Sequence, residues 1–140
     1  MDRIYFAHAM CDYDTAREGF AIMNIERAFP RCEIVNPNTP KFSEAYERSG
    51  KDFTYWLKLA LSCDRLVFMA MPGKGRLISS GVAKEAMLFD GNRKPVYEID
   101  RKTFQLLTTV VPRPGPWERV MSEEDTRKIV DMINDWRAVA

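Results

Sequence analysis

Hydrophobic and amphipathic segments alternate through the first hundred residues of the chain. The hydrophobic segments are short and apolar on both faces, which is typical of strands inside a parallel sheet. They cover residues 3–7, 32–35, 65–71 and 95–99. The segments between them have apolar residues at helical spacing and predict helices over 15–28, 43–61 and 79–90, with a break near Ser49-Gly50. This alternation predicts a parallel sheet with crossover helices.

The pattern is weaker in the last part of the chain. Residues 106–111 allow a fifth strand, and the prolines within 112–116 predict a linker or flap after it. Ser122 and Asp125 match the pattern of a helix N-terminus. The helix that follows is expected to bury a stripe formed by Ile129, Met132, Ile133 and Trp136.

Together these elements predict one domain over residues 1–140, with a doubly wound, mainly parallel α/β sheet of the flavodoxin or Rossmann type. The expected strand order is 2-1-3-4-5. Ligands of such sheets bind beyond the carboxyl ends of the strands, at the point where the strand order reverses. This rule points to the loops at 8–14 and 72–80, which follow the first and third hydrophobic segments.

Charge and composition narrow the range of partners. The 21 Lys and Arg residues nearly balance the 20 Asp and Glu residues, and a net charge of +1 disfavours a nucleic acid polymer. Cys11, Cys32 and Cys63 form no CxxC pair, which indicates free thiols in a reducing compartment, and too few ligands remain for a metal. No apolar run, the longest being 66–71, suffices for a signal peptide or a membrane span. We therefore expect a cytoplasmic protein with no membrane partner.

Two residues near the expected site could perform chemistry. Glu85 lies near the start of the helix at 79–90, where the positive helix end should favour its ionised form. An ionised carboxylate there could be a nucleophile or could stabilise a cationic transition state. It could also be an ordinary acidic residue on the exposed surface of a helix start. His8 is the only histidine, and it could act as an acid, a base or a hydrogen-bond donor, or could fill a loop.

The remaining candidates have ordinary structural explanations as well. Asp64 directly precedes the third strand and could be a turn or capping acid, and Tyr5 in the first strand would be a core residue unless a carboxylate lies beside its hydroxyl. Ser79 and Ser80 at a helix N-terminus would suit an anion. The segment 73–76 lacks the spacing of a phosphate-binding loop, which favours a solvated turn.

Three segments of the chain resemble the nucleoside 2-deoxyribosyltransferase superfamily. They are Arg3-Ile4-Tyr5-Phe6-Ala7, Cys63-Asp64-Arg65-Leu66-Val67-Phe68 and Ser79-Ser80-Gly81-Val82-Ala83-Lys84-Glu85. The resemblance covers roughly residues 3 to 99 and implies a glutamate that attacks the anomeric carbon of a nucleoside or nucleotide, without a cofactor. It implies that Glu85 is the nucleophile, that Tyr5 orients it, and that Asp64 lies on the base-binding side.

The serine at position 79 resembles the 2'-deoxynucleoside 5'-monophosphate N-glycosidase branch, where S-x-G-V-x-x-E includes the glycine found here at Gly81. This serine implies a phosphorylated substrate. We expect substrate binding by Ser79, Ser80, Gly81 and His8 in the loops around the expected site. The segment 7–12 departs from the glycine-rich phosphate loop of that branch. Two alternatives therefore stay open: a nucleotide-binding module without turnover, and an NAD or ADP-ribose glycohydrolase like those among TIR-like domains.

Two structural expectations follow from the resemblance. Tyr5 and Glu85 should lie within hydrogen-bond reach of each other, although eighty residues separate them. The chain should also form a homodimer or larger homo-oligomer, because members of this superfamily complete their sites across a subunit interface. The proline-containing segment 112–117 is the expected contributor to that interface.

Overall fold

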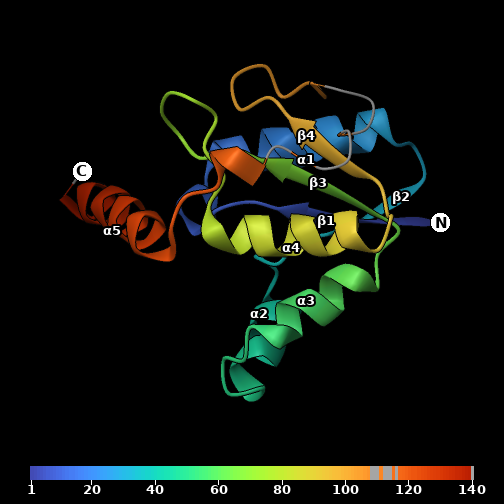
Figure 1. The fold of residues 1–140 in the computed structure, drawn as a ribbon, viewed down its shortest axis with the longest axis horizontal. Coiled ribbons are helices and arrows are strands. Elements are labelled where there is room, and N and C mark those ends of the chain that lie inside the picture. Colours follow the sequence, from blue (N-terminus) through green and yellow to red (C-terminus); the bar gives the residue numbers. More distant parts are fainter. Residues whose placement is uncertain (108–110, 112–114, 116, 140) are drawn as a thin grey trace.

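A parallel four-stranded sheet forms the centre of the molecule (Figure 1). The computed structural model describes residues 1–107, 111, 115 and 117–139, and the side chains of all of these except 130 and 133–139. The strand order is β2-β1-β3-β4, which confirms the predicted α/β class and the order of the first four strands. The strands are β1 (Asp2–Ala7), β2 (Cys32–Val35), β3 (Arg65–Met69) and β4 (Val96–Ile99).

Helices connect these strands at the places that the sequence predicts, and one further helix follows them. The connecting helices are α1 (Ala16–Ala28), α2 (Pro40–Arg48), α3 (Thr54–Leu61) and α4 (Ser80–Gly91), and α5 (Glu123–Val139) comes after β4. The predicted break between α2 and α3 is confirmed, because Gly50 has a φ of 79°, a conformation that favours glycine. The 3-10 turns η1 (Met10–Asp12) and η2 (Trp117–Arg119) complete the set of described helical segments.

Alternate side chains of the strands face the two sides of the sheet. Ile4 and Phe6 of β1 are fully buried and pack in a cluster with Ile25 of α1. Tyr5 and Ala7 belong to the opposite cluster, which includes α4. Figure 1 shows the same layering, with α1 and α4 on opposite sides of the sheet. Each large apolar side chain buried in this way contributes about 1.5–3 kcal/mol relative to exposure.

The predicted fifth strand is not seen. Leu106 forms only an isolated antiparallel bridge with Ile99, and residues 108–110 of the predicted strand lie outside the described residues. Of the predicted interface segment, 112–114 and 116 also lie outside them. Trp117 packs against the core of its own chain, and its Nε1 donates to Asp90 at 3.2 Å. The predicted contribution of this segment to an interface stays a prediction.

The helix α5 starts where the sequence predicts, and the predicted apolar stripe is confirmed at Ile129 and wrong at Met132. Ile129 packs against the cluster that includes Cys11 and Met71, whereas Met132 is 64% exposed. Ile133 and Trp136 lie outside the described side chains. In Figure 1, α5 extends away from the carboxyl ends of the strands. Among the described residues, no helix is long and apolar enough to cross a membrane.

Candidate functional site

A hydrogen bond between Tyr5 and Glu85 lies at the centre of the candidate site. Tyr5 is in the middle of β1, and its hydroxyl donates to Oε2 of Glu85 on α4. Both residues are buried, and α4 packs on the face of the sheet that Tyr5 points to. The predicted contact between the two side chains is confirmed.

Burial controls the charge of this carboxyl group. It raises the pKa of Glu85 from 4.5 to about 8, because an ionised carboxylate loses its hydration there, and the hydrogen bond from Tyr5 lowers the pKa only in part. The expectation that the helix start keeps Glu85 ionised is therefore wrong for the pocket without a ligand. Burial and the neighbouring Glu85 also raise the pKa of Tyr5, so the phenol stays protonated and donates.

The pair opens into a cavity of about 390 Å³. That volume falls within the range of about 300–1,000 Å³ that small-molecule sites occupy. Aromatic side chains from three parts of the chain form much of its wall: Tyr13, Tyr46, Phe53 and Trp56. The rings of Tyr46 and Trp56 lie 4.9 Å apart between centroids. The cavity can therefore hold a flat apolar group beside a buried carboxyl group.

The amino end of α4 forms another edge of the cavity, where Ser79 and Gly81 line it. Ser79 is the N-cap of the helix, and its hydroxyl accepts from the backbone N–H of Val82 at 3.4 Å. The N–H of Ser80 donates to the hydroxyl of Thr126 on α5 at 3.1 Å. An anion at this helix end would therefore compete with Thr126 for the amide of Ser80.

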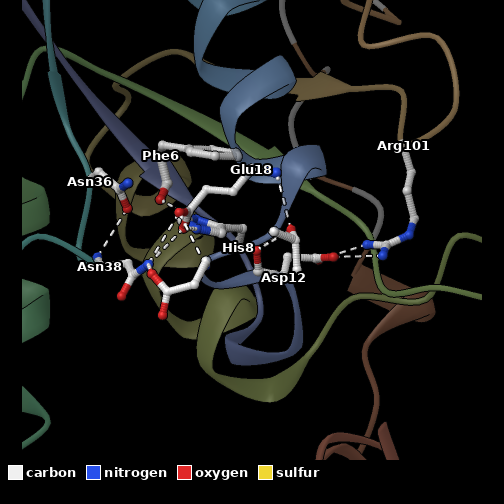
Figure 2. A network of polar contacts seen from close by, with 9 residues as sticks. Phe6, His8, Asp12, Glu18, Asn36, Asn38 and Arg101 are labelled. Carbon is white, nitrogen blue, oxygen red and sulfur yellow. Dashed lines mark hydrogen bonds and ion pairs between the residues drawn. The ribbon is translucent and has the colours of Figure 1, made fainter. Parts of the chain in front are cut away.

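His8 also lines the cavity, but the protein uses both of its ring nitrogens (Figure 2). Nδ1 lies 3.0 Å from the carbonyl oxygen of Phe6 and Nε2 lies 2.7 Å from Oε2 of Glu18. Both partners are acceptors, so Nδ1 donates to the carbonyl, and the second proton lies between Nε2 and the carboxyl group. His8 shapes the wall of the cavity and keeps neither nitrogen available for a ligand.

Glu18 is held by more than His8. Burial alone would raise the pKa of Glu18, but hydrogen bonds from His8, Asn38 and the amide of Asp14 outweigh it and hold the pKa below its ordinary value. The side-chain nitrogen of Asn38 lies 3.1 and 3.2 Å from the two carboxylate oxygens. Figure 2 shows these side chains converging from three separate segments of the chain. They fix the loop after β1 that borders the cavity.

Two predicted site residues, Ser80 and Asp64, do not line the cavity, and Asp64 lies at the other end of the sheet. It lies just before β3, where its Oδ2 accepts from the backbone N–H of Arg3 at 2.8 Å, and its own N–H donates to the carbonyl of Arg3 at 2.8 Å. These bonds join the amino ends of β1 and β3. The carboxylate therefore helps to join two strands at the end of the sheet opposite to the candidate site.

Sequence reasoning missed several members of the site. Phe53 and Trp56 read as core residues because their spacing is helical, although they border the cavity. Glu18 was not singled out, yet Thr15 and Glu18 match the T-x-x-E pattern of a helix start, and Thr15 does cap α1. No local sequence pattern predicts that Thr126 belongs to the site, because its contact with Ser80 depends on how α5 packs near the amino end of α4.

The described part of the chain contains no group of three or more His, Cys, Asp or Glu side chains placed to hold a metal ion. The polar side chains that line the cavity are instead two carboxyl groups, three phenols, three hydroxyls and an imidazole: Glu47, Glu85, Tyr5, Tyr13, Tyr46, Ser43, Ser79, Thr126 and His8. Comparison of the chain with protein-family models, with curated proteins and with solved structures finds no match, so no relative indicates what this cavity binds.

Proposed function

We propose that the protein cleaves or transfers the N-glycosidic bond of a nucleoside or nucleoside 5'-monophosphate, with Glu85 as the nucleophile. The observation that supports this most is the hydrogen bond from Tyr5 to Glu85 within an aromatic-walled cavity. The resemblance of the three sequence segments supports the same assignment. The proposal needs no cofactor, because a carboxylate can capture the sugar after the base leaves.

The chemistry requires Glu85 in its ionised form. Cleavage of a glycosidic bond develops positive charge at the anomeric carbon, and a carboxylate beside that carbon stabilises the charge and can form the glycosyl ester. At pH 7 a group with a pKa of about 8 is protonated in about nine molecules of ten. The developing positive charge of the substrate lowers that pKa, so the substrate itself favours the reactive form.

Tyr5 is the positioning group in this proposal. Its hydroxyl donates to Oε2 of Glu85 and leaves Oε1 for the anomeric carbon. The aromatic side chains Tyr46, Phe53 and Trp56 supply flat surfaces suited to the leaving base. Gly81 lines the cavity without a side chain, which leaves room for the sugar near the amino end of α4.

A base-release assay tests the proposal. Purified protein is incubated with a panel of nucleosides and 5'-monophosphates, and the free base is separated by chromatography. Glu85→Gln should abolish release, because Gln keeps the size of Glu but cannot attack as an anion. Binding of the same ligands, measured by calorimetry, should change little. For the wild type, release should rise about tenfold per pH unit up to about pH 8.

Glu26→Gln is the matched control, since Glu26 is exposed on α1 and does not line the cavity. This variant should release base at the wild-type rate. Wild-type turnover by Glu85→Gln would show that the nucleophile lies elsewhere. Nicotinamide release from NAD, with no base released from the panel, would favour the glycohydrolase alternative.

A nucleotide-binding module without turnover is the second candidate. The raised pKa of Glu85 favours it, because a carboxyl group that is mostly neutral at pH 7 is a poor nucleophile but a good hydrogen-bond donor to a ligand. Tight binding of a nucleotide by calorimetry, with no base released at any pH, would support this candidate and would rule out the glycosidase.

A further inference from the structure

A second cavity, of about 430 Å³, lies at the carboxyl ends of β3 and β4. The segment 70–76 after β3 and residues 98 and 100–102 of β4 and the turn after it form most of its wall, and Arg17 of α1 adds to it. It shares no lining residue with the Tyr5–Glu85 cavity. A ligand there would therefore occupy a separate site.

The side chains around this second cavity are mainly cationic. Five cations, namely Arg17, Lys74, Arg76, Arg101 and Lys102, face two carboxylates, Glu98 and Asp100. The whole chain has a net charge of only +1, so positive charge is concentrated here. Such a concentration inside a concave site attracts anions.

The two carboxylates are already engaged. Glu98 is buried and accepts from Arg76 at 2.6 Å and from Arg119 at 2.8 Å, so two guanidinium groups share one carboxylate. Arg119 does not line the cavity, so it holds Glu98 from outside. Glu98 is therefore fully engaged and leaves the other cations of the cavity without a carboxylate partner from this residue.

Asp100 is held in a turn. Its Oδ1 accepts from the backbone N–H groups of Thr103 and Lys102 at 2.9 and 2.7 Å, which hold the pKa of Asp100 below its ordinary value. Arg101 is paired with Asp12 of η1 through both terminal nitrogens, at 2.7 and 2.6 Å (Figure 2). These bonds fix the turn that follows β4 and define one wall of the cavity.

The loop after β3 also lines the cavity. Gly73, Gly75 and Arg76 have φ values of 106°, 85° and 49°. This left-handed backbone is unfavourable for a residue with a side chain, and Arg76 is held in it while its guanidinium pairs with Glu98. Open space surrounds the position where Gly73 would carry a Cβ. Lys74 is exposed between the two glycines, and no ion pair involving it is found within the described residues.

We propose that this second cavity binds a small anion that has two or more phosphate groups. The cavity has more cations than carboxylates, and no ion pair of Arg17, Lys74 or Lys102 is found among the described residues. These three cations remain for an anion, and together they suit the several negative charges of two neighbouring phosphate groups on one ligand. A cavity of this volume holds a small molecule rather than a polymer.

Calorimetric titration with inorganic pyrophosphate at fixed ionic strength tests this site. The wild type should bind with 1:1 stoichiometry, and citrate should bind at least tenfold more weakly. Lys74→Ser/Lys102→Ser should weaken pyrophosphate binding by about tenfold or more, because two cations are lost. The control Lys58→Ser/Lys128→Ser removes two exposed lysines outside the cavity and should change the Kd less than twofold.

Several results would overturn the proposal. They are the absence of saturable binding by the wild type, an equal loss in the control variant, and citrate binding as tightly as pyrophosphate. A single-stranded oligonucleotide that competes at lower concentration than pyrophosphate would assign the surface to a polymer instead. Glu85→Gln should keep the wild-type Kd for pyrophosphate. The test of this site and the test of the proposed glycosidase activity can therefore fail independently of each other.

Discussion

The carboxyl group of Glu85 combines two properties that oppose each other. It receives a hydrogen bond from Tyr5, which favours the ionised form, and it is buried, which favours the neutral form. Burial is the stronger effect, and the pKa rises to about 8. The burial of this carboxyl group therefore lowers the stability of the fold at neutral and alkaline pH.

The contribution of Glu85 to the free energy of unfolding depends on pH. In the unfolded chain Glu85 releases its proton near its ordinary pKa of 4.5, whereas the folded chain holds it up to about 8. The stabilising contribution is complete below about pH 4.5 and is lost as the pH rises to 8, at about 1.4 kcal/mol per unit. Urea unfolding of Glu85→Gln should lack this slope, and the variant should exceed the wild type by a few kcal/mol at pH 8.

Glu26→Gln again provides the comparison, because its side chain is exposed on α1. Its stability should follow the wild-type curve between pH 5 and 9. Parallel curves for Glu85→Gln and the wild type would mean that Glu85 titrates alike in the folded and unfolded chains, and the burial argument would then be wrong.

Among the helices, α4 has the most direct connection between its own stability and the site. Ser79 caps its amino end. Ser79→Ala should lower the free energy of unfolding by about 1 kcal/mol, because the N–H of Val82 loses its acceptor. Ser79→Asp should restore most of that stability, since aspartate also caps helices and its charge suits the positive helix end. Urea denaturation measures both changes.

The same two variants separate capping from phosphate recognition. If Ser79 also holds a 5'-phosphate, Ser79→Asp should lower the affinity for 5'-monophosphates much more than the affinity for nucleosides. The reason is repulsion between the aspartate and the phosphate, which are both negatively charged. Equal affinities of Ser79→Asp and the wild type for a 5'-monophosphate would limit Ser79 to its structural role.

Over the whole molecule, the predicted self-association can be tested at an apolar residue on the edge of the cavity. Met10 lines the Tyr5–Glu85 cavity and is 64% exposed. Light scattering at micromolar concentration should give a particle of at least twice 16.2 kDa. Met10→Lys should shift it to 16.2 kDa, because a charge would enter an apolar contact. Met87→Lys, at an exposed methionine of α4 outside the cavity, should leave the particle unchanged.

The sequence predicts the sheet better than the site. The segments 3–7 and 65–71 predict β1 and β3 correctly, because buried parallel strands are apolar on both faces. Glu18 and Thr126 could not be found in this way, since their partners His8 and Ser80 come from other segments. The pKa of Glu85 depends on burial by the whole fold, so a local rule about helix ends gave the wrong direction.

The contact between Thr126 and Ser80 makes the cavity depend on two distant parts of the chain. The four described strands and α4 lie within residues 2–99, whereas Thr126 belongs to α5 and lines the cavity. A chain cut before α5 would keep every strand-pairing residue of the sheet but would lose one lining residue of the pocket and the partner of the Ser80 amide.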